Sequence, residues 1–313
     1  MMLRYIIRRT VQIIPTLLGV SILSFSLLYV FPGDPAELIV RISAGVDNPT
    51  PEMIEKFRIE SGLDKPIVLQ YFNWLSHIVR GDFGVSWTSG KPVLEEILER
   101  FPASAVLFFS TFLISIIFAF LLGIVAALYR DRLMDHITRI WALLGISIPS
   151  FWLGLMLIWL FSVRLHLLPS FGFGTLKHAI LPVLTWSMSF MAIKTRFVRA
   201  SLLDALSQDY VLTARSKGLS DGLIVFRHAL RNALIPIITY LSMSMGHLIV
   251  GSVMIEVVFA WPGLGSYLVS SVFRRDFPVV QALVLLSGVM FTVMNLIVDI
   301  LYAIIDPRIR YGG

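Results

Sequence analysis

Six long apolar runs constrain this chain more than any other feature of its sequence. A helix needs about 20 residues, most of them apolar, to cross the hydrocarbon core of a bilayer. The runs that approach or exceed this length are 10–33, 101–129, 140–163, 179–193, 232–255 and 277–305, the last interrupted only by Asp299. They predict an all-α integral membrane protein with six transmembrane helices.

Two features within the runs qualify this prediction. The run 179–193 is short, and we expect its helix to continue through Lys194, whose ammonium group would snorkel to the interface. Pro15, Pro149 and Pro182 lie inside runs. A bundle tolerates kinks at such prolines, because neighbouring groups satisfy the freed carbonyls.

Composition agrees with a membrane protein and excludes other classes. The 313 residues are 57% hydrophobic and 15% charged, with a mean hydropathy of +0.81, which is unusual for a soluble domain. The absence of cysteine excludes a disulfide framework and cysteine-based chemistry. The net charge of +6 does not indicate nucleic acid, because the basic residues lie at the ends of apolar runs and in one loop.

The distribution of Lys and Arg over the short loops predicts the orientation. The first run is too long for a signal peptide and no small-residue cleavage site follows it, so we expect a retained first helix. An inner N-terminus places most short-loop cations inside: Arg4, Arg8, Arg9, Arg130, Arg132, Arg139, Lys194, Arg196, Arg199, Arg215, Lys217, Arg227, Arg231, Arg308 and Arg310. The short outer loops hold only Arg164, Lys177, Arg274 and Arg275. Both termini are therefore predicted to be cytoplasmic.

Three parts follow from this topology. Residues 1–33 form a cytoplasmic N-terminus and the first transmembrane helix, and residues 34–100 form an extracytoplasmic segment with short helices at 51–61, 68–79 and 93–100. Residues 101–313 form a five-helix core with a cytoplasmic loop at about 195–236. The outer segment is either a packed cap or a contact surface for a partner that delivers substrate.

The inner loop between the fourth and fifth runs is the most polar stretch of the core. Its sequence from Asp209 is helical in composition up to Lys217, Gly218 is a natural helix C-terminal residue, and Ser220 or Asp221 can cap a second helix. An apolar face then recurs at helical spacing, opposite Arg227 and Arg231, at Leu219, Leu223, Phe226 and Leu230. A helical hairpin with such a mixed face is suited to docking into another protein.

Motifs for enzymatic chemistry are absent from the sequence. The only Gly-Lys pair, at Gly90, is followed by Pro92, so the chain has no phosphate-binding loop. Metalloprotease and nucleophile-elbow motifs are also absent. Glu95 and Glu99 lie in the outer segment, where a solvated face explains them. We therefore expect no catalytic residues.

Motifs along the whole chain resemble those of the membrane subunits of ABC importers in the peptide/nickel permease family, closest to the nickel permeases. The segment 212–218 stands at the place of the E-A-A-x-x-x-G signature, and 227–233 follows as in that family. The supporting motifs, in order, are Pro32-Gly-Asp-Pro35, Arg80-Gly-Asp-Phe-Gly84, Pro149-Ser-Phe-Trp152, Arg199-Ala-Ser201, Phe259-Ala-Trp-Pro-Gly-Leu-Gly265, Arg275-Asp-Phe-Pro-Val-Val-Gln281 and Asp306-Pro-Arg308. The chain departs from the general signature at Leu212, Thr213 and Arg231.

The resemblance implies a type I importer permease fold and a role for the inner loop in coupling to an ATPase. The residues it implies in coupling are Asp209, Thr213, Ala214, Arg215, Lys217, Gly218, Leu219, Arg227, His228 and Arg231. It also implies four kinds of partner: a second homologous permease, two cytoplasmic ATPase subunits, an extracytoplasmic substrate-binding protein and the lipid bilayer. This chain would bind no cofactor, since ATP and Mg would reside in the partner ATPases.

Four residues are candidates for the translocation path. Glu256 and Asp299 lie near span ends, where an ionisable residue indicates function, structural pairing or snorkelling. Met243 and His247 share a helix face, and a thioether and an imidazole are soft metal ligands, although an interior histidine with satisfied hydrogen bonds is the plainer alternative. His247 is the one candidate metal ligand.

The resemblance favours nickel or a nickel chelate as the substrate, with di- or oligopeptides as the alternative. A secondary transporter or channel is the alternative from a different class. That class predicts midplane carboxylates and inverted repeats, neither of which is evident in this sequence.

Overall fold

The computed structural model is helical almost throughout. It describes residues 2–30, 33–43, 45 and 48–305, and the side chains of residues 10–30, 33–42, 45, 48–241 and 252–300. Across these ranges the only β pairing is an isolated bridge between Val85 and Pro92. The all-α prediction is therefore confirmed.

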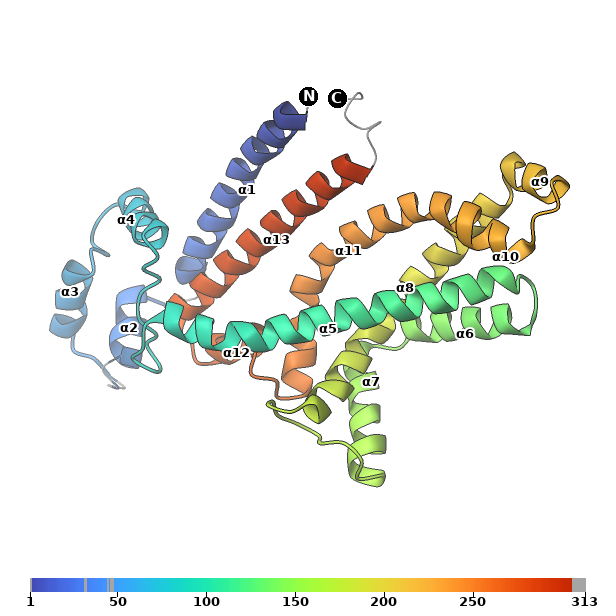
Figure 1. Cartoon of the computed structure of the whole chain (residues 1–313). Coiled ribbons are helices and arrows are strands. Elements are labelled where there is room, and N and C mark those ends of the chain that lie inside the picture. Colours follow the sequence, from blue (N-terminus) through green and yellow to red (C-terminus); the bar gives the residue numbers. More distant parts are fainter. Residues whose placement is uncertain (1, 31–32, 44, 46–47, 306–313) are drawn as a thin grey trace. The chain divides into compact units, whose positions relative to one another are not determined.

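Figure 1 follows the helices in chain order. The long ones are α1 (Met2–Val30), α5 (Val93–Leu128), α8 (Leu176–Leu206), α11 (Leu230–Val258) and α13 (Phe277–Ile305). The shorter ones are α2 (Pro35–Ser43), α3 (Pro51–Glu60), α4 (Ile67–Val79), α6 (Leu133–Ser147), α7 (Ser150–Leu157), η1 (Ile158–Arg164), α9 (Asp209–Ser216), α10 (Asp221–Leu223), η2 (Ile224–Ala229) and α12 (Leu264–Phe273), of which η1 and η2 are π-helical. By length and composition, five helices within the described residues can cross a membrane, or six if one bent pair forms a single span.

The bent pair corrects the prediction of a continuous third span at 140–163. The axis of α6 turns by 104° into that of α7 and η1. Pro149 has no amide hydrogen and disfavours helical geometry in the residue before it, and Ile148 is accordingly extended, with φ −84° and ψ 122°. The proline therefore breaks this helix, whereas Pro15 and Pro182 lie inside continuous helices.

Two further boundaries differ from those predicted. The fourth span extends well beyond 179–193, because α8 runs through the polar residues that follow. The outer helix predicted at 93–100 is not separate, since those residues form the first turns of α5. The other two short helices are confirmed as α3 and α4. Thr50 caps α3 by accepting a hydrogen bond from the Met53 amide at 3.3 Å.

The chain divides into two compact units, each with its own core. The first comprises Met1–Ile6, Ala103–Pro262 and Met294–Gly313, and the second comprises Ile7–Pro102 and Gly263–Val293. The predicted parts 1–33, 34–100 and 101–313 are defined by their location relative to the membrane, not by compactness, so they remain a prediction.

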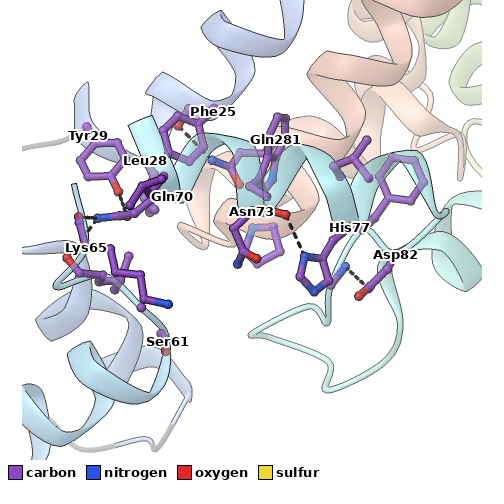
Figure 2. A pocket seen from close by; sticks show the side chains of 18 residues that line it. Phe25, Leu28, Tyr29, Ser61, Lys65, Gln70, Asn73, His77, Asp82 and Gln281 are labelled. Atoms are coloured by element: carbon purple, nitrogen blue, oxygen red, sulfur yellow. Dashed lines mark hydrogen bonds between the residues drawn. The ribbon is translucent and has the colours of Figure 1, made fainter. Parts of the chain in front are cut away.

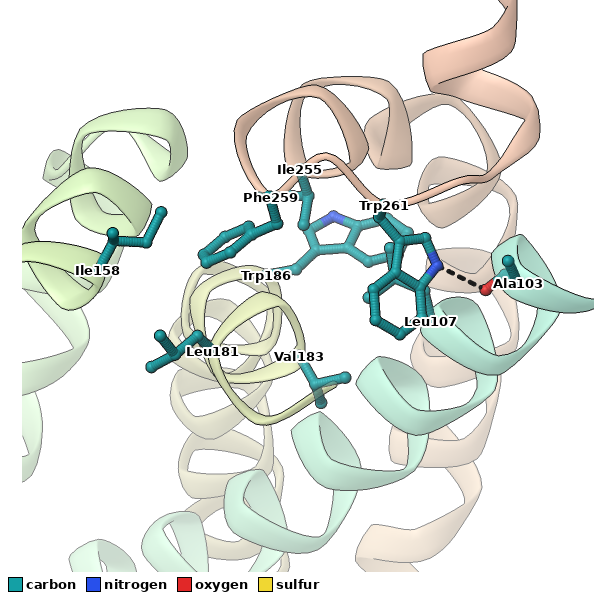
Figure 3. Packing of buried hydrophobic residues seen from close by; sticks show 9 residues of the cluster. All are labelled: Ala103, Leu107, Ile158, Leu181, Val183, Trp186, Ile255, Phe259 and Trp261. Carbon is teal, nitrogen blue, oxygen red and sulfur yellow. Dashed lines mark hydrogen bonds between the residues drawn. The ribbon is translucent and has the colours of Figure 1, made fainter. Parts of the chain in front are cut away.

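The core of the first unit is built on aromatic side chains and close helix contacts. Figure 3 shows Trp186, Phe259 and Trp261 packed together, with the Trp261 indole donating to the Ala103 carbonyl at 2.9 Å. Elsewhere in this unit α5 meets α8 at Gly123. A Cβ there would lie 2.7 Å from the Val198 side chain, so only glycine permits this approach.

The apolar core of the second unit joins α5 and α13, and hydrogen bonds connect α1 to α13. Its buried apolar residues are Val93, Ile97, Val279, Ala282 and Leu283. Buried polar bonds supplement it: the Ser24 hydroxyl donates to the Gln281 carbonyl at 2.7 Å, and the Gln281 amide donates to the Phe25 carbonyl at 3.1 Å. This unit therefore combines apolar packing with hydrogen bonds between distant segments.

A carboxylate at the start of α13 closes the loop that precedes α5. Asp276 is 2% exposed and accepts hydrogen bonds from the Ser86 hydroxyl at 2.6 Å, the Trp87 amide at 3.2 Å and the Thr88 amide at 3.1 Å. Three donors compensate for the burial of its charge. The loop is thereby tied to a residue 190 positions later in the chain.

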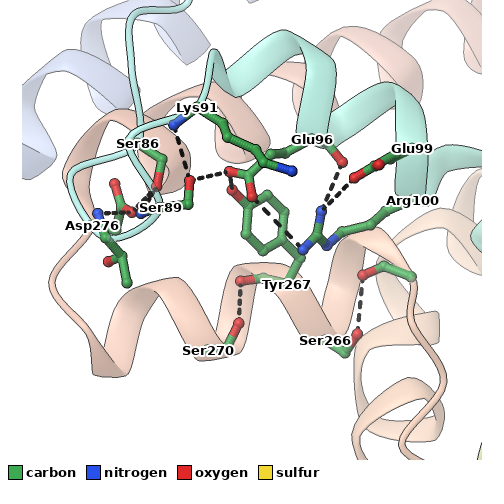
Figure 4. Close-up of polar contacts among 12 residues, drawn as sticks. Ser86, Ser89, Lys91, Glu96, Glu99, Arg100, Ser266, Tyr267, Ser270 and Asp276 are labelled. Atoms are coloured by element: carbon green, nitrogen blue, oxygen red, sulfur yellow. Dashed lines mark hydrogen bonds and ion pairs between the residues drawn. The ribbon is translucent and has the colours of Figure 1, made fainter.

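A second buried carboxylate, Glu96, lies nearby in the same unit (Figure 4). It accepts hydrogen bonds from the hydroxyls of Tyr267 and Ser89. The Arg100 guanidinium lies 4.1 Å from the centre of the Tyr267 ring. Burial, reinforced by the bond to Glu96, raises the pKa of the Tyr267 phenol well above its ordinary value, so the phenol stays protonated and remains a donor.

Candidate functional site

The loop between α8 and α11 is a helical hairpin with a defined turn. Gly218 follows α9 with φ +77°, in the left-handed region that glycine adopts without strain. Its amide donates to the Arg215 carbonyl at 2.9 Å, and the Leu219 amide donates to the Ala214 carbonyl at 3.3 Å. This pair of bonds is the Schellman motif, and it confirms the predicted role of Gly218 in ending the first helix.

The second arm of the hairpin begins at Asp221 and continues without a break into α11. Ser220 occupies the N-cap position, as predicted, but its side chain makes no capping bond. The arm passes through α10 and the π-helix η2 before α11 begins. The fifth span is therefore continuous with the turn of the hairpin.

An apolar contact fixes the two arms to one another. Val211 and Ala214 on the first arm pack against Ile224 on the second, with Tyr210 at the edge. The Tyr210 hydroxyl donates to the Ala205 carbonyl at the end of α8, at 2.8 Å. The hairpin is therefore internally packed and tied to the end of α8.

The outer surface of the hairpin carries large apolar side chains among its polar and charged residues. Leu212 is 69% exposed and Phe226 is 62% exposed, and Leu219 and Leu223 are exposed as well. Leu230, the fourth residue of the predicted apolar face, packs instead against the core of the first unit. Exposed large apolar side chains grouped on a polar loop mark an interaction surface.

The predicted coupling residues surround this apolar surface. Arg215 and Asp221 form an ion pair across the turn at 3.3 Å, and both are largely exposed. The Thr213 hydroxyl donates to the Asp209 carbonyl at 3.1 Å. The exposed residues of the set are Asp209, Thr213, Arg215, Lys217, Gly218, Leu219, Arg227 and Arg231, while His228 is half-buried and Ala214 faces inward. The structure thus brings the set together on the hairpin and the first turn of α11, and their contacts with a partner remain a prediction.

The path candidates have different surroundings. Glu256 is fully buried and accepts a hydrogen bond from the Ser104 hydroxyl at 2.8 Å, which agrees with structural pairing. Asp299 is half-buried on α13. The backbone of α11 passes through Met243 and His247, and their side chains lie outside those that the structure describes. The proposed metal ligand therefore remains a prediction.

Lys194 corrects a sequence prediction. It was expected to snorkel, but it is 1% exposed, and its ammonium group donates to the Ser115 hydroxyl at 2.7 Å. The group also lies 4.9 Å and 5.6 Å from the ring centres of Phe112 and Phe190. A hydroxyl and two aromatic faces thus compensate for the lost water. No local sequence pattern joins residues on α5 and α8, so sequence reasoning missed this site.

A second buried charge was also missed. Asp135, at the start of α6, is fully buried and accepts two bonds of 2.7 Å from the Arg199 guanidinium on α8. It also accepts the Asp131 amide at 3.0 Å. A bidentate pair of this kind fixes the relative position of two helices. The one sequence feature that could have indicated this pair is the position of an acidic residue, Asp135, just before the apolar run that begins at residue 140.

Comparisons with known proteins agree with this architecture. Residues 119–311 match the family described as binding-protein-dependent transport system inner membrane component, and residues 2–108 match the N-terminal region of such components. The glutathione transport system permease protein GsiC of Escherichia coli strain K12 is 45% identical over 310 residues, covering 99% of this chain and all of the relative. The GsiC protein of Shigella dysenteriae serotype 1 has the same identity and coverage.

Two solved structures share the fold. One is the crystal structure of an amino acid ABC transporter with histidines, with a TM-score of 0.55 at 13% identity, covering 66% of this chain and 93% of that one. The other is the inward-facing MetNI methionine ABC transporter, with a TM-score of 0.54 at 15% identity, covering 67% and 96%. The chain therefore belongs to the binding-protein-dependent transport system inner membrane components, in the peptide/nickel group of bacterial ABC importer permeases, as a multi-pass protein of the inner membrane.

Proposed function

We propose that this chain forms half of a translocation path and couples ATP hydrolysis by two cytoplasmic ATPase subunits to the uptake of short peptides of the glutathione class. The other half of the path belongs to a second homologous permease, and an extracytoplasmic binding protein delivers the substrate. Both termini and the hairpin lie on the cytoplasmic side, as the distribution of Lys and Arg predicts.

The observation that carries this proposal is the hairpin of α9, Gly218 and η2. Its inner side is packed through Val211 and Ile224, and its outer side exposes Leu212 and Phe226. A rigid element that is continuous with α11 can pass the movement of a bound ATPase to the bundle. Membership of an ABC importer family favours ATP hydrolysis over an ion gradient as the energy source for transport.

The hydrolytic chemistry resides in the partners under this proposal. The sequence has no phosphate-binding loop, so ATP and Mg²⁺ are assigned to the ATPase subunits and this chain carries no catalytic residue. The lipid bilayer is the remaining partner, and we propose no nucleic acid contact.

Relatives support the peptide assignment of the substrate, since two curated permeases that share 45% identity with this chain carry the name glutathione transport system. Nickel or a nickel chelate is the second candidate, because Met243 and His247 are four residues apart on α11 and share a helix face. Glutathione is itself a peptide, so it counts with the dipeptides as one candidate class. An uptake experiment with labelled peptides and labelled nickel therefore separates the peptide candidate from the nickel candidate.

The test is uptake by cells that express the complete transporter. Labelled glutathione, a labelled dipeptide and labelled nickel are supplied separately, with a strain lacking the ATPases as the control. ATP-dependent accumulation of a peptide supports the proposal, and accumulation of nickel alone would reject the peptide assignment. For nickel, His247→Ala should lower uptake selectively if His247 is a ligand, whereas unchanged uptake would exclude that role.

A further inference from the structure

A hollow in the second unit is lined by none of the hairpin residues and by none of the path candidates. It has a volume of about 300 Å³ and is bounded by α4, the loop before it and the ends of α1 and α13 (Figure 2). Phe25, Trp74 and Pro278 supply apolar wall. Small-molecule sites range from roughly 300 to 1,000 Å³, so the hollow is suited to a ligand of di- or tripeptide size.

The frame of this hollow is fixed by a fully bonded glutamine. The Gln70 amide nitrogen donates to the carbonyls of Leu63 at 3.1 Å and Lys65 at 2.8 Å, and its oxygen accepts the Tyr29 hydroxyl. These bonds tie the loop before α4 to α4 itself and to α1. These bonds therefore fix the backbone positions from which the other side chains of the hollow extend.

Four polar groups that line the hollow retain unused hydrogen-bonding capacity. Lys65 and Asp82 form no ion pair within the described part of the chain, and the Asn73 side-chain amide has no partner there either. Asp82 accepts the Gly84 amide at 2.9 Å through one oxygen, which leaves the other available. The His77 Nδ1 lies 2.9 Å from the Asn73 carbonyl. A carbonyl only accepts, so Nδ1 carries a proton, and Nε2 has no hydrogen-bond partner in the described part of the chain.

The arrangement of these groups matches one class of ligand. In Figure 2, Asn73 and His77 lie between Lys65 and Asp82, so a cation and an anion stand at opposite ends of a row with an amide between them. A carboxylate would pair with Lys65, an ammonium group with Asp82 and a peptide group with Asn73. No group of three His, Asp or Glu side chains suited to a metal ion occurs in the described part of the chain.

We propose that this hollow binds a short zwitterionic peptide at a site that includes none of the path candidates. The inference rests on the proposed function for its substrate class, and on the proposed orientation for placing the site on the outer side. Bound there, a peptide would occupy the permease without a binding protein. The site would let peptide bind the permease directly.

The test measures peptide binding to the full-length chain in lipid nanodiscs, without ATPases or binding protein. Labelled dialanine and labelled glutathione are the probes in equilibrium dialysis. We expect saturable binding that Lys65→Gln and Asp82→Asn each weaken about tenfold or more, because each removes one charge-assisted bond. Asp64→Asn is the matched control, since Asp64 is exposed beside Lys65 but does not line the hollow. Dialanine with acetylated and amidated ends should not compete.

Three results would overturn the inference: no saturable binding, equal binding by the pocket variants and the control, or competition by the blocked dipeptide. If no peptide binds and Lys65→Gln instead loses affinity for the binding protein, the first of these results assigns the surface to docking. Uptake by the complete transporter reports on the proposed function separately. Peptide uptake without nanodisc binding rejects only the site. Uptake of nickel alone, together with saturable peptide binding in nanodiscs, rejects only the peptide assignment of the proposed function.

Discussion

The hairpin after α8 and the loop before α5 use charged side chains in opposite ways. In the hairpin, Arg215 and Asp221 pair at 3.3 Å in the open, where solvent weakens the attraction. In the loop, Asp276 is 2% exposed and holds three donors. Buried carboxylates with several donors fix a fold, whereas exposed pairs leave charge available for a partner. The difference indicates that the loop is built for stability and the hairpin for binding.

The largest expected effect tests the stabilising side of this comparison. Asp276→Ala leaves the buried Ser86 hydroxyl and two backbone amides without their acceptor, which should lower the free energy of unfolding by about 3 kcal/mol. Denaturant unfolding in detergent, monitored by tryptophan fluorescence, measures the loss. Asp64→Ala is the exposed control. Equal unfolding midpoints for the two variants would show that the Asp276 bonds do not stabilise the loop.

The turn of the hairpin should show a large effect on transport instead. Gly218→Pro removes the amide that bonds to the Arg215 carbonyl and imposes a negative φ where the chain needs +77°. We expect uptake to be abolished while membrane insertion is retained. Gly218→Asn is the matched control, since asparagine tolerates the left-handed region. Uptake at the wild-type level in Gly218→Pro would remove the hairpin from the coupling mechanism.

The exposed apolar residues should have an intermediate effect on partner binding. Leu212→Ser and Phe226→Ser should each weaken binding of the purified ATPase about tenfold, because burial of such a side chain contributes about 1.5–3 kcal/mol. Leu176→Ser and Phe273→Ser are matched controls, being 88% and 84% exposed elsewhere. Affinity is measured by biolayer interferometry on nanodiscs. Equal losses in variants and controls would mean that the hairpin is not the docking surface.

The smallest expected effect on stability comes from the exposed ion pair. Arg215→Glu should leave the unfolding midpoint unchanged, because both partners of the pair are solvated. Uptake should nevertheless fall if the cation faces the ATPase. A clear drop in the midpoint would show that the pair is structural and would narrow the contrast with Asp276.

Features with a local signal in the sequence were predicted well. The apolar runs located the spans, and the sequence around Gly218 predicted the turn, because helix termination depends on a few neighbouring residues. The 104° bend at Pro149 was predicted only as a tolerated kink. Its size depends on whether neighbouring groups satisfy the freed carbonyls, and a single sequence does not show them.

Features that join distant residues were missed. Lys194 is held by Ser115, which lies 79 residues away, and Asp276 is held by a loop 190 residues before it. A snorkelling lysine and a buried one look identical in sequence, since the difference lies in the facing helix. The hollow around Asn73 was equally invisible, because its walls come from α1, α4 and α13.

The exposed hairpin also has a consequence for the life of the protein in the cell. A copy made in excess of its ATPase partners presents Leu212 and Phe226 to the cytosol, if the proposed orientation holds. Large uncovered apolar side chains promote aggregation. We therefore expect orphan copies to be short-lived and the supply of ATPase subunits to set how much permease accumulates. Pulse-chase labelling with and without the ATPases would measure that dependence.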